Sequence, residues 1–215
     1  MRVFGAVAAA AVLITGLAGV DATAGATPAP TVKVVVRPVT STGHHRAGFT
    51  VSGEPSGLVD CSFADPSPGA VNRNIEFCSP SAEYAIACWK AAAPHRVLCM
   101  RNPRRKHLVR IPRHGAFAST NLAPASQRAP LVFNLRDGDH CSIRDGGAGP
   151  IRQGHPHWVA TYYCVDDGVV WMKPSAAHLG VNESAASWTV LTGGETGPLV
   201  TRHLTKAWFV GTYHV

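Results

Sequence analysis

Short apolar runs separated by turn-forming residues dominate the chain after residue 25, and no apolar pattern of helical period is sustained there. The runs are rich in Val, Ile, Tyr, Trp and Phe, and clusters of Gly, Pro, Asn and Asp lie between them. This is the pattern of strands joined by turns. The sequence therefore predicts an all-β fold in which antiparallel hairpins and a meander form a sandwich or a barrel-like domain.

The strongest strand signals come in pairs around short turns. Three hairpins are expected: 83–89 with 96–100, 131–135 with 140–143, and 158–165 with 169–172. Asp137-Gly138 and Asp167-Gly168 lie in two of the turns, and Asp-Gly accepts the positive φ that a two-residue primed turn requires. The last two hairpins make a meander with a glycine-rich loop, 145–157, between its middle strands. Further strands are expected at 32–36, 186–192 and 204–210, and residues 116–130 are expected to be a loop between two lobes of the sheet.

The first residues have the pattern of a secretory leader. Arg2 precedes an almost wholly apolar run, and small-x-small sites end at Ala24 and Ala26. We expect residues 1–24 to be a signal peptide, although a run of this length could instead remain as an uncleaved membrane anchor. No other run is long enough to span a bilayer. We therefore expect an exported protein, secreted or in the cell envelope, with a flexible segment at 25–57 that holds a first strand and a disulfide-bonded β domain at 58–215.

All six cysteines follow the leader, and export permits disulfides. No C-x-x-C occurs, which argues against a thioredoxin-like site or a zinc ribbon. Cys88 and Cys99 face one another across the first hairpin, and Cys141 and Cys164 lie on strands joined by the glycine-rich loop. The predicted disulfides are Cys61–Cys78, Cys88–Cys99 and Cys141–Cys164.

The formal net charge is +7, and much of the excess lies in one stretch, residues 101–114. The candidate polyanion-binding residues are Arg101, Arg104, Arg105, Lys106, Arg110 and Arg113. They could hold an anionic envelope polymer or anionic lipid headgroups. Alternatively, they could protect an exposed edge strand from aggregation. Nucleic acid is disfavoured, because no aromatic residues are interleaved for base stacking and no helix-turn-helix or finger spacing accompanies the stretch.

The sequence gives little support to catalysis. It contains no G-x-S-x-G elbow. Ser175-Ala176-Ala177-His178 is faintly similar to the histidine segment of trypsin-like proteases, but residues 193–198 hold no serine to act as nucleophile. The pairs Asp137 with Asp139 and Asp166 with Asp167 are neighbours at hairpin turns, where Asp serves turn formation. We assign no catalytic residue, and the question of an enzyme stays open.

Histidines offer the one metal candidate. His155 and His157 point to the same face of an extended segment, and His140 begins the neighbouring strand. Asp139 or Asp145 could complete a zinc site, but no standard ligand spacing accompanies them. We therefore expect no metal and no cofactor, and keep His140, His155 and His157 as the residues to check.

Aromatic side chains leave another alternative open. They could line a carbohydrate-binding face, or they could fill the core from alternating strands. The residues concerned are Trp89, Trp158, Trp171, Trp188, Trp208, Tyr162 and Tyr163.

Several stretches resemble a group of exported actinobacterial, chiefly mycobacterial, proteins that contain cysteines and have no established activity. The stretches span most of the chain after the leader: Arg37-Pro38-Val39-Thr40, Asp60-Cys61-Ser62-Phe63, Cys78-Ser79-Pro80-Ser81-Ala82, Ala87-Cys88-Trp89 with Leu98-Cys99, Asp137-Gly138 before Cys141, Asp145-Gly146-Gly147 before Cys164, and Ala207-Trp208-Phe209-Val210-Gly211-Thr212. The resemblance implies an exported, disulfide-bonded domain and transfers no catalytic residue.

Taken together, these patterns favour a binding or structural interaction module. The alternative is a secreted hydrolase whose site is assembled from dispersed residues. A cleft in which His, Asp and Ser or Arg converge would favour the enzyme, and an exposed basic or aromatic patch would favour the binding module.

Overall fold

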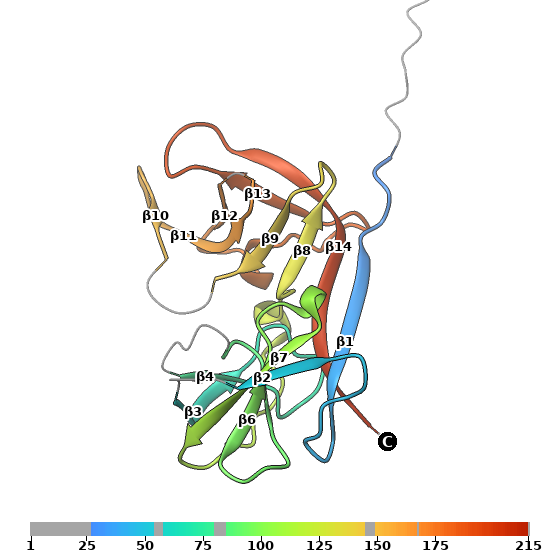
Figure 1. Ribbon diagram of the computed structural model, residues 1–215. Helices are drawn as coiled ribbons and strands as arrows, with labels where there is room; N and C mark the ends of the chain where they lie inside the picture. Colours follow the sequence, from blue (N-terminus) through green and yellow to red (C-terminus); the bar gives the residue numbers. More distant parts are fainter. Residues whose placement is uncertain (1–26, 54–57, 80–84, 145–148, 167, 215) are drawn as a thin grey trace, which may run out of the picture.

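The computed structural model describes residues 27–53, 58–79, 85–144, 149–166 and 168–214, and in them it confirms an all-β fold. Two sheets form two lobes (Figure 1). The first sheet contains β1 (Val32–Thr40), β8 (Val132–Leu135), β9 (His140–Ile143), β10 (Ile151–Arg152), β11 (His155–Cys164), β12 (Val169–Met172), β13 (Thr189–Gly193) and β14 (Val200–Tyr213). The second sheet contains β2 (Thr50–Gly53), β3 (Val59–Pro66), β4 (Glu76–Ser79), β5 (Cys88–Lys90), β6 (Arg96–Cys99) and β7 (His107–His114). Three short 3₁₀ helices complete the described elements: η1 (Pro103–Arg105), η2 (Ala125–Gln127) and η3 (His178–Gly180).

Most of the first sheet closes into an antiparallel barrel, here called the barrel lobe. Its strand order is β14-β13-β12-β11-β9-β8, and β8 pairs back with β14. Closure pairs both edges of these strands, so among the described residues the six barrel strands leave no long edge open to another chain. The predicted barrel-like closure is therefore confirmed, and the meander of residues 131–173 supplies four of the six barrel strands, β8, β9, β11 and β12.

The second sheet, here called the second lobe, also returns on itself. Its order is β2-β7-β3-β4-β5-β6, with β6 pairing back to β7. Strand β7 is thus paired with β6 on one side and with β2 and β3 on the other. The interpretation of residues 107–114 as an exposed edge strand is wrong, because both sides of β7 are hydrogen-bonded.

Strand β14 joins the lobes. Its first half lies in the barrel wall, and its second half runs with the parallel strand β1 alongside the second lobe (Figure 1). Val210 of β14 exchanges backbone hydrogen bonds with the β3–β4 connection, accepting from Val71 and donating to Gly69, each at 2.9 Å. The segment 25–57, expected to be flexible with one strand, contributes a strand to each sheet through β1 and β2.

One hydrophobic core runs through both lobes. Phe133, Tyr162 and Leu204 fill the barrel, and the same cluster continues to Trp89 and Leu108 of the second lobe. The lobes therefore bury apolar surface against each other, a dominant stabilising contribution in folded domains.

The predicted disulfide pairs are confirmed. Cys88 pairs with Cys99 directly across β5 and β6, and Cys141 with Cys164 directly across β9 and β11. Cys61 and Cys78 join β3 to β4. Each bridge closes a local loop, worth about 3 kcal/mol in the chain-entropy model.

The prediction of a glycine-rich loop at 145–157 is wrong over its second half. Ile151–Arg152 forms β10, and β11 begins at His155. Gln153 and Gly154 make the turn between them, with Gly154 at φ +74, the positive φ that glycine adopts without strain. Asp145, Asp167 and the predicted signal peptide lie outside the described residues. Among the described residues, no helix is long and apolar enough to cross a membrane.

The second lobe buries an ionisable group. Glu76 on β4 is 0 % exposed, and its carboxylate oxygens lack a hydrogen-bond donor among the described residues. It lies among the sulfurs of the Cys61–Cys78 bridge. Burial raises its pKa to about 8, and the Arg113 charge opposes this only in part. The carboxyl is therefore mostly protonated at neutral pH and is a pH-sensitive point in the fold.

We predict that Glu76→Gln removes a pH dependence of stability. In the unfolded chain the pKa of Glu76 returns to about 4.5. Between pH 4.5 and about pH 8, the native state therefore keeps a proton on Glu76 that the unfolded chain has lost. The contribution of protonated Glu76 is fully present below pH 4.5 and is lost as the pH rises through about 8. In urea unfolding, the variant should match the wild type at pH 4.5 and exceed it by about 5 kcal/mol at pH 9.

The control is Glu195→Gln, which changes an exposed carboxylate and should leave the pH dependence as it is. Parallel stability profiles for Glu76→Gln and the wild type would contradict the prediction.

Candidate anion-binding site

A compact turn carries the basic stretch out of β6 and into β7. Asn102 accepts a hydrogen bond from the Arg104 amide at 3.0 Å, and Pro103 follows it as the first residue of η1. Both residue types are preferred at these helix-start positions. Lys106 ends η1 with a left-handed φ of 50°. The turn therefore has a defined shape set by its own sequence.

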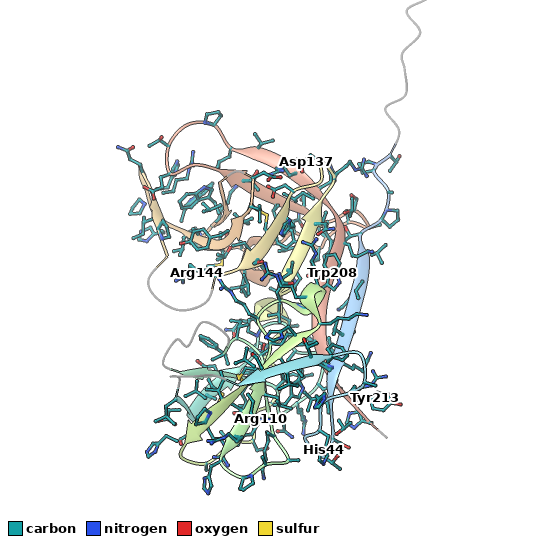
Figure 2. The ribbon with its side chains drawn as sticks, in the orientation of Figure 1. His44, Arg110, Asp137, Arg144, Trp208 and Tyr213 are labelled. Carbon is teal, nitrogen blue, oxygen red and sulfur yellow. A yellow bond between two sulfur atoms is a disulfide. The ribbon has the colours of Figure 1, made fainter. Side chains whose placement is uncertain are left out.

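The structure divides the six predicted polyanion-binding residues. Arg104, Arg105, Lys106 and Arg110 are exposed, whereas Arg101 and Arg113 are half-buried. Figure 2 shows Arg110 in the second lobe, away from Trp208 at the waist between the lobes. The six basic side chains do not form one continuous patch, since only part of the stretch lies at the junction between the lobes.

Arg104 and Arg113 make contacts within the fold. The Arg104 guanidinium lies over the Trp208 ring of β14, 5.5 Å from its centroid, where Lys206 also approaches at 5.6 Å. Arg113 donates to the Gly115 carbonyl and provides the charge that opposes the raised pKa of Glu76. Arg104 thereby fixes η1 against the barrel lobe, and Arg113 supports the second lobe.

A cavity of about 470 Å³ lies where η1 faces the barrel lobe. Its lining comes from both lobes: Arg101, Asn102, Arg105, His107, His140, Ser142 and Val165. Among the described residues that line it, four carry basic side chains and none is acidic. The cavity thus presents cationic and hydrogen-bonding groups to whatever enters.

The second-lobe side of the cavity is held by β2. The two ring nitrogens of His107 form hydrogen bonds with the hydroxyl groups of Thr50, at 3.0 Å, and Ser52, at 3.1 Å. These bonds follow from the parallel pairing of β2 with β7, which places Thr50 opposite His107. The imidazole is therefore fixed in orientation.

On the barrel side of the cavity, the alternation of side chains along β9 sets which residues face outward. His140 and Ser142 lie two residues apart on β9, so they share the outer face, while Cys141 and Ile143 point into the barrel. The disulfide from Cys141 to Cys164 locks β9 to β11 behind them. Sequence reasoning missed Asn102, Ser142 and Val165, although the alternation around Cys141 was a usable signal for Ser142.

A buried carboxylate supports this wall. Asp139 is 2 % exposed and accepts hydrogen bonds from the amides of His140, Val165 and Asp166 at 2.6 to 3.2 Å. Arg202 pairs with it at 3.1 Å and also with Asp137 at 2.6 Å. The hydrogen bond from Arg202 lowers the pKa of Asp137. These aspartates therefore fix the strand ends beside the cavity, in keeping with the turn role expected of them.

The structure does not assemble the histidine metal candidates. His140 lies beside Val165 at one end of β11, whereas His155 and His157 lie at the other end, about 25 to 30 Å along the strand. Among the described residues, the two clusters with metal-ligand geometry contain disulfide cysteines and none of these histidines. His178 is hydrogen-bonded to the Arg128 carbonyl at 2.7 Å.

The aromatic residues divide between core and surface. Trp89, Trp171 and Tyr162 are buried, and the Tyr162 hydroxyl donates to the Pro130 carbonyl at 2.8 Å. Trp158, Trp188 and Trp208 are half-buried, and Tyr163 is 47 % exposed. Adjacent tyrosines on β11 thus point to opposite sides of the barrel wall.

Comparisons with family models, with curated proteins and with solved structures found no match for this chain.

We predict that Arg104→Ala lowers the stability of the protein more than Arg105→Ala does. Loss of the Arg104 contact with Trp208 should lower the free energy of unfolding by about 1 kcal/mol. Arg105 is exposed at the cavity, so its loss should change stability by less than about 0.5 kcal/mol. Urea unfolding of both variants measures this, and equal losses would contradict the assignment.

Proposed function

We propose that this protein is an exported binding module that holds an anionic polymer of the cell envelope. The observation that carries the proposal is the cavity between the lobes, whose described lining includes Arg105, His140, the amide of Asn102 and the hydroxyl of Ser142 but no carboxylate. Arginine presents several donors in a planar fork that suits carboxylate and phosphate oxygens. A lining of this kind favours an anionic group.

The surroundings of the cavity also favour binding over hydrolysis. Asp137 and Asp139 are engaged by Arg202, and His178 is engaged by a backbone carbonyl. A nucleophile would need a base at hydrogen-bond distance, held in turn by a third group. At the cavity, His107 lies between the hydroxyls of Ser52 and Thr50, but Ser52 does not line the cavity and neither partner of the ring is a carboxylate, so the hydrolase alternative has less support.

An exported location is part of the proposal. Three disulfides suit an oxidising compartment, and the apolar start of the sequence has the pattern of a cleavable leader. The resemblance to exported actinobacterial proteins agrees with both. We therefore propose that the ligand is an anionic polymer met outside the cytoplasm.

We predict salt-sensitive binding of anionic polymers that depends on Arg105. Heparin and long-chain polyphosphate should bind the purified wild-type protein at low salt and weaken as salt screens the charges. Arg105→Ala should reduce the affinity about 10-fold, the effect of losing a charge-assisted hydrogen bond. Equilibrium titration of a fluorescent polymer provides the measurement.

The matched control is Arg96→Ala, which removes the same charge from an exposed site at the far end of β6. It should cost less than 2-fold, as expected for a distant screened charge. Equal losses in the two variants would show diffuse attraction and contradict a site. Binding to vesicles of anionic phospholipid without binding to either soluble polymer would identify a lipid headgroup instead and overturn the polymer proposal.

We predict that the exported form begins at Gly25 or Thr27, because small-x-small sites end at Ala24 and Ala26. Intact-mass measurement of protein recovered outside the cytoplasm determines the first residue. A recovered species that retains Met1 would support the membrane anchor and contradict cleavage.

A further inference from the structure

We propose that the cavity continues onto a sugar-binding surface formed by Tyr163, so that the ligand is an acidic glycan. The inference rests on the proposed function and specifies its ligand class. The acid group would lie in the basic cavity, and the adjoining sugar ring would lie against the tyrosine.

Strand register places Tyr163 next to the cavity. Ser142, which lines the cavity, lies directly opposite Tyr163 across β9 and β11. Residues directly opposite one another in an antiparallel pair share a face and lie about 5 Å apart. Val165, two residues after Tyr163, lines the cavity as well. The tyrosine therefore borders the cavity on the outer wall of the barrel.

The exposure of Tyr163 differs from that of its neighbour. Tyr162 is 0 % exposed within the core, whereas Tyr163 is 47 % exposed and Val165 is 66 % exposed. Together Tyr163 and Val165 form an apolar surface beside the basic cavity. Large apolar side chains exposed at the rim of a polar pocket are typical of a ligand surface.

Three other aromatic rings at the surface are approached by cations. Lys173 lies over Trp158 at 5.0 Å, and Arg46 lies over Tyr213 at 3.9 Å. Trp208 is approached by Arg104 and Lys206. Among the ring and cation contacts of the described residues, none involves Tyr163. Its ring face is therefore available for stacking.

The combination of groups fits a sugar acid better than a simple anion. The C–H face of a pyranose packs on an aromatic ring, and its hydroxyls need nearby hydrogen-bond partners, here Ser142 and Asn102. A carboxylate on the same sugar, or on the next sugar of the chain, would contact Arg105 in the cavity. A phosphate chain without rings would leave Tyr163 unused.

Two ligands of similar charge test this inference. Isothermal titration of the wild-type protein with an oligogalacturonate and with a short polyphosphate should show binding of both. Tyr163→Ala should weaken the oligogalacturonate about 3- to 10-fold, the range measured for aromatic contacts, and should leave the polyphosphate unchanged. Tyr163→Phe, which keeps the ring, should retain oligogalacturonate affinity, and Arg105→Ala should weaken both ligands.

Tyr213→Ala is the matched control, since it removes another exposed tyrosine and should change neither affinity. The urea midpoint of each variant shows that it is folded. An unchanged oligogalacturonate affinity in Tyr163→Ala, or equal losses for the two ligands, would overturn the glycan inference. Binding of polyphosphate alone would also overturn it while leaving the anion site intact, whereas binding of neither ligand would refute the proposed function itself.

Discussion

The backbone pairing of β14 is the constraint on which the rest of the structure depends. This strand (Val200–Tyr213) completes the barrel between β13 and β8, and then continues with β1 beside the second lobe. Its carbonyls and amides also reach the β3–β4 connection at Val210. Because a strand offers hydrogen bonds along two edges only, using each stretch for a different partner lets one strand hold both lobes.

The cavity depends on this junction. One wall belongs to η1, which rests on β14 through Arg104 and Trp208, and the other belongs to β9 and the end of β11. Asp139, Arg202 and the Cys141–Cys164 bridge hold the second wall from behind. A ligand would therefore meet groups that are already positioned, which reduces the ordering cost of binding.

Local chemistry made much of the fold predictable from the sequence. Asp137-Gly138 marked the hairpin of β8 and β9, and the separate hairpin of 83–89 with 96–100 placed Cys88 opposite Cys99. The meander then brought Cys141 to the strand beside Cys164. The parallel pairing of β1 with β14 was not predictable, because it joins segments about 170 residues apart and leaves no local pattern. The turn at Gln153-Gly154 was missed for a related reason, since a two-residue strand has too few positions to show alternation.

The candidate site was only half predictable, because its groups come from two lobes. Charge density identified Arg101 and Arg105, but nothing in the sequence said which strand would face them. The sequence also could not show which side chains of β11 point into the barrel. Tyr162 and Tyr163 are identical residues, and only the strand register assigns Tyr162 to the core. A shift of one residue would exchange their roles.

The basic stretch shows why charge density alone does not define a site. Arg104 covers an aromatic ring, Arg113 lies near a buried carboxyl, and Arg110 lies on the second lobe. Edge protection does not account for the stretch, because β7 is paired on both sides. Arg105 is different, since it is exposed and lines a cavity where the opposite wall adds His140 and Ser142. Convergence of groups from two lobes, more than the number of positive charges, is what makes this position suited to an anion.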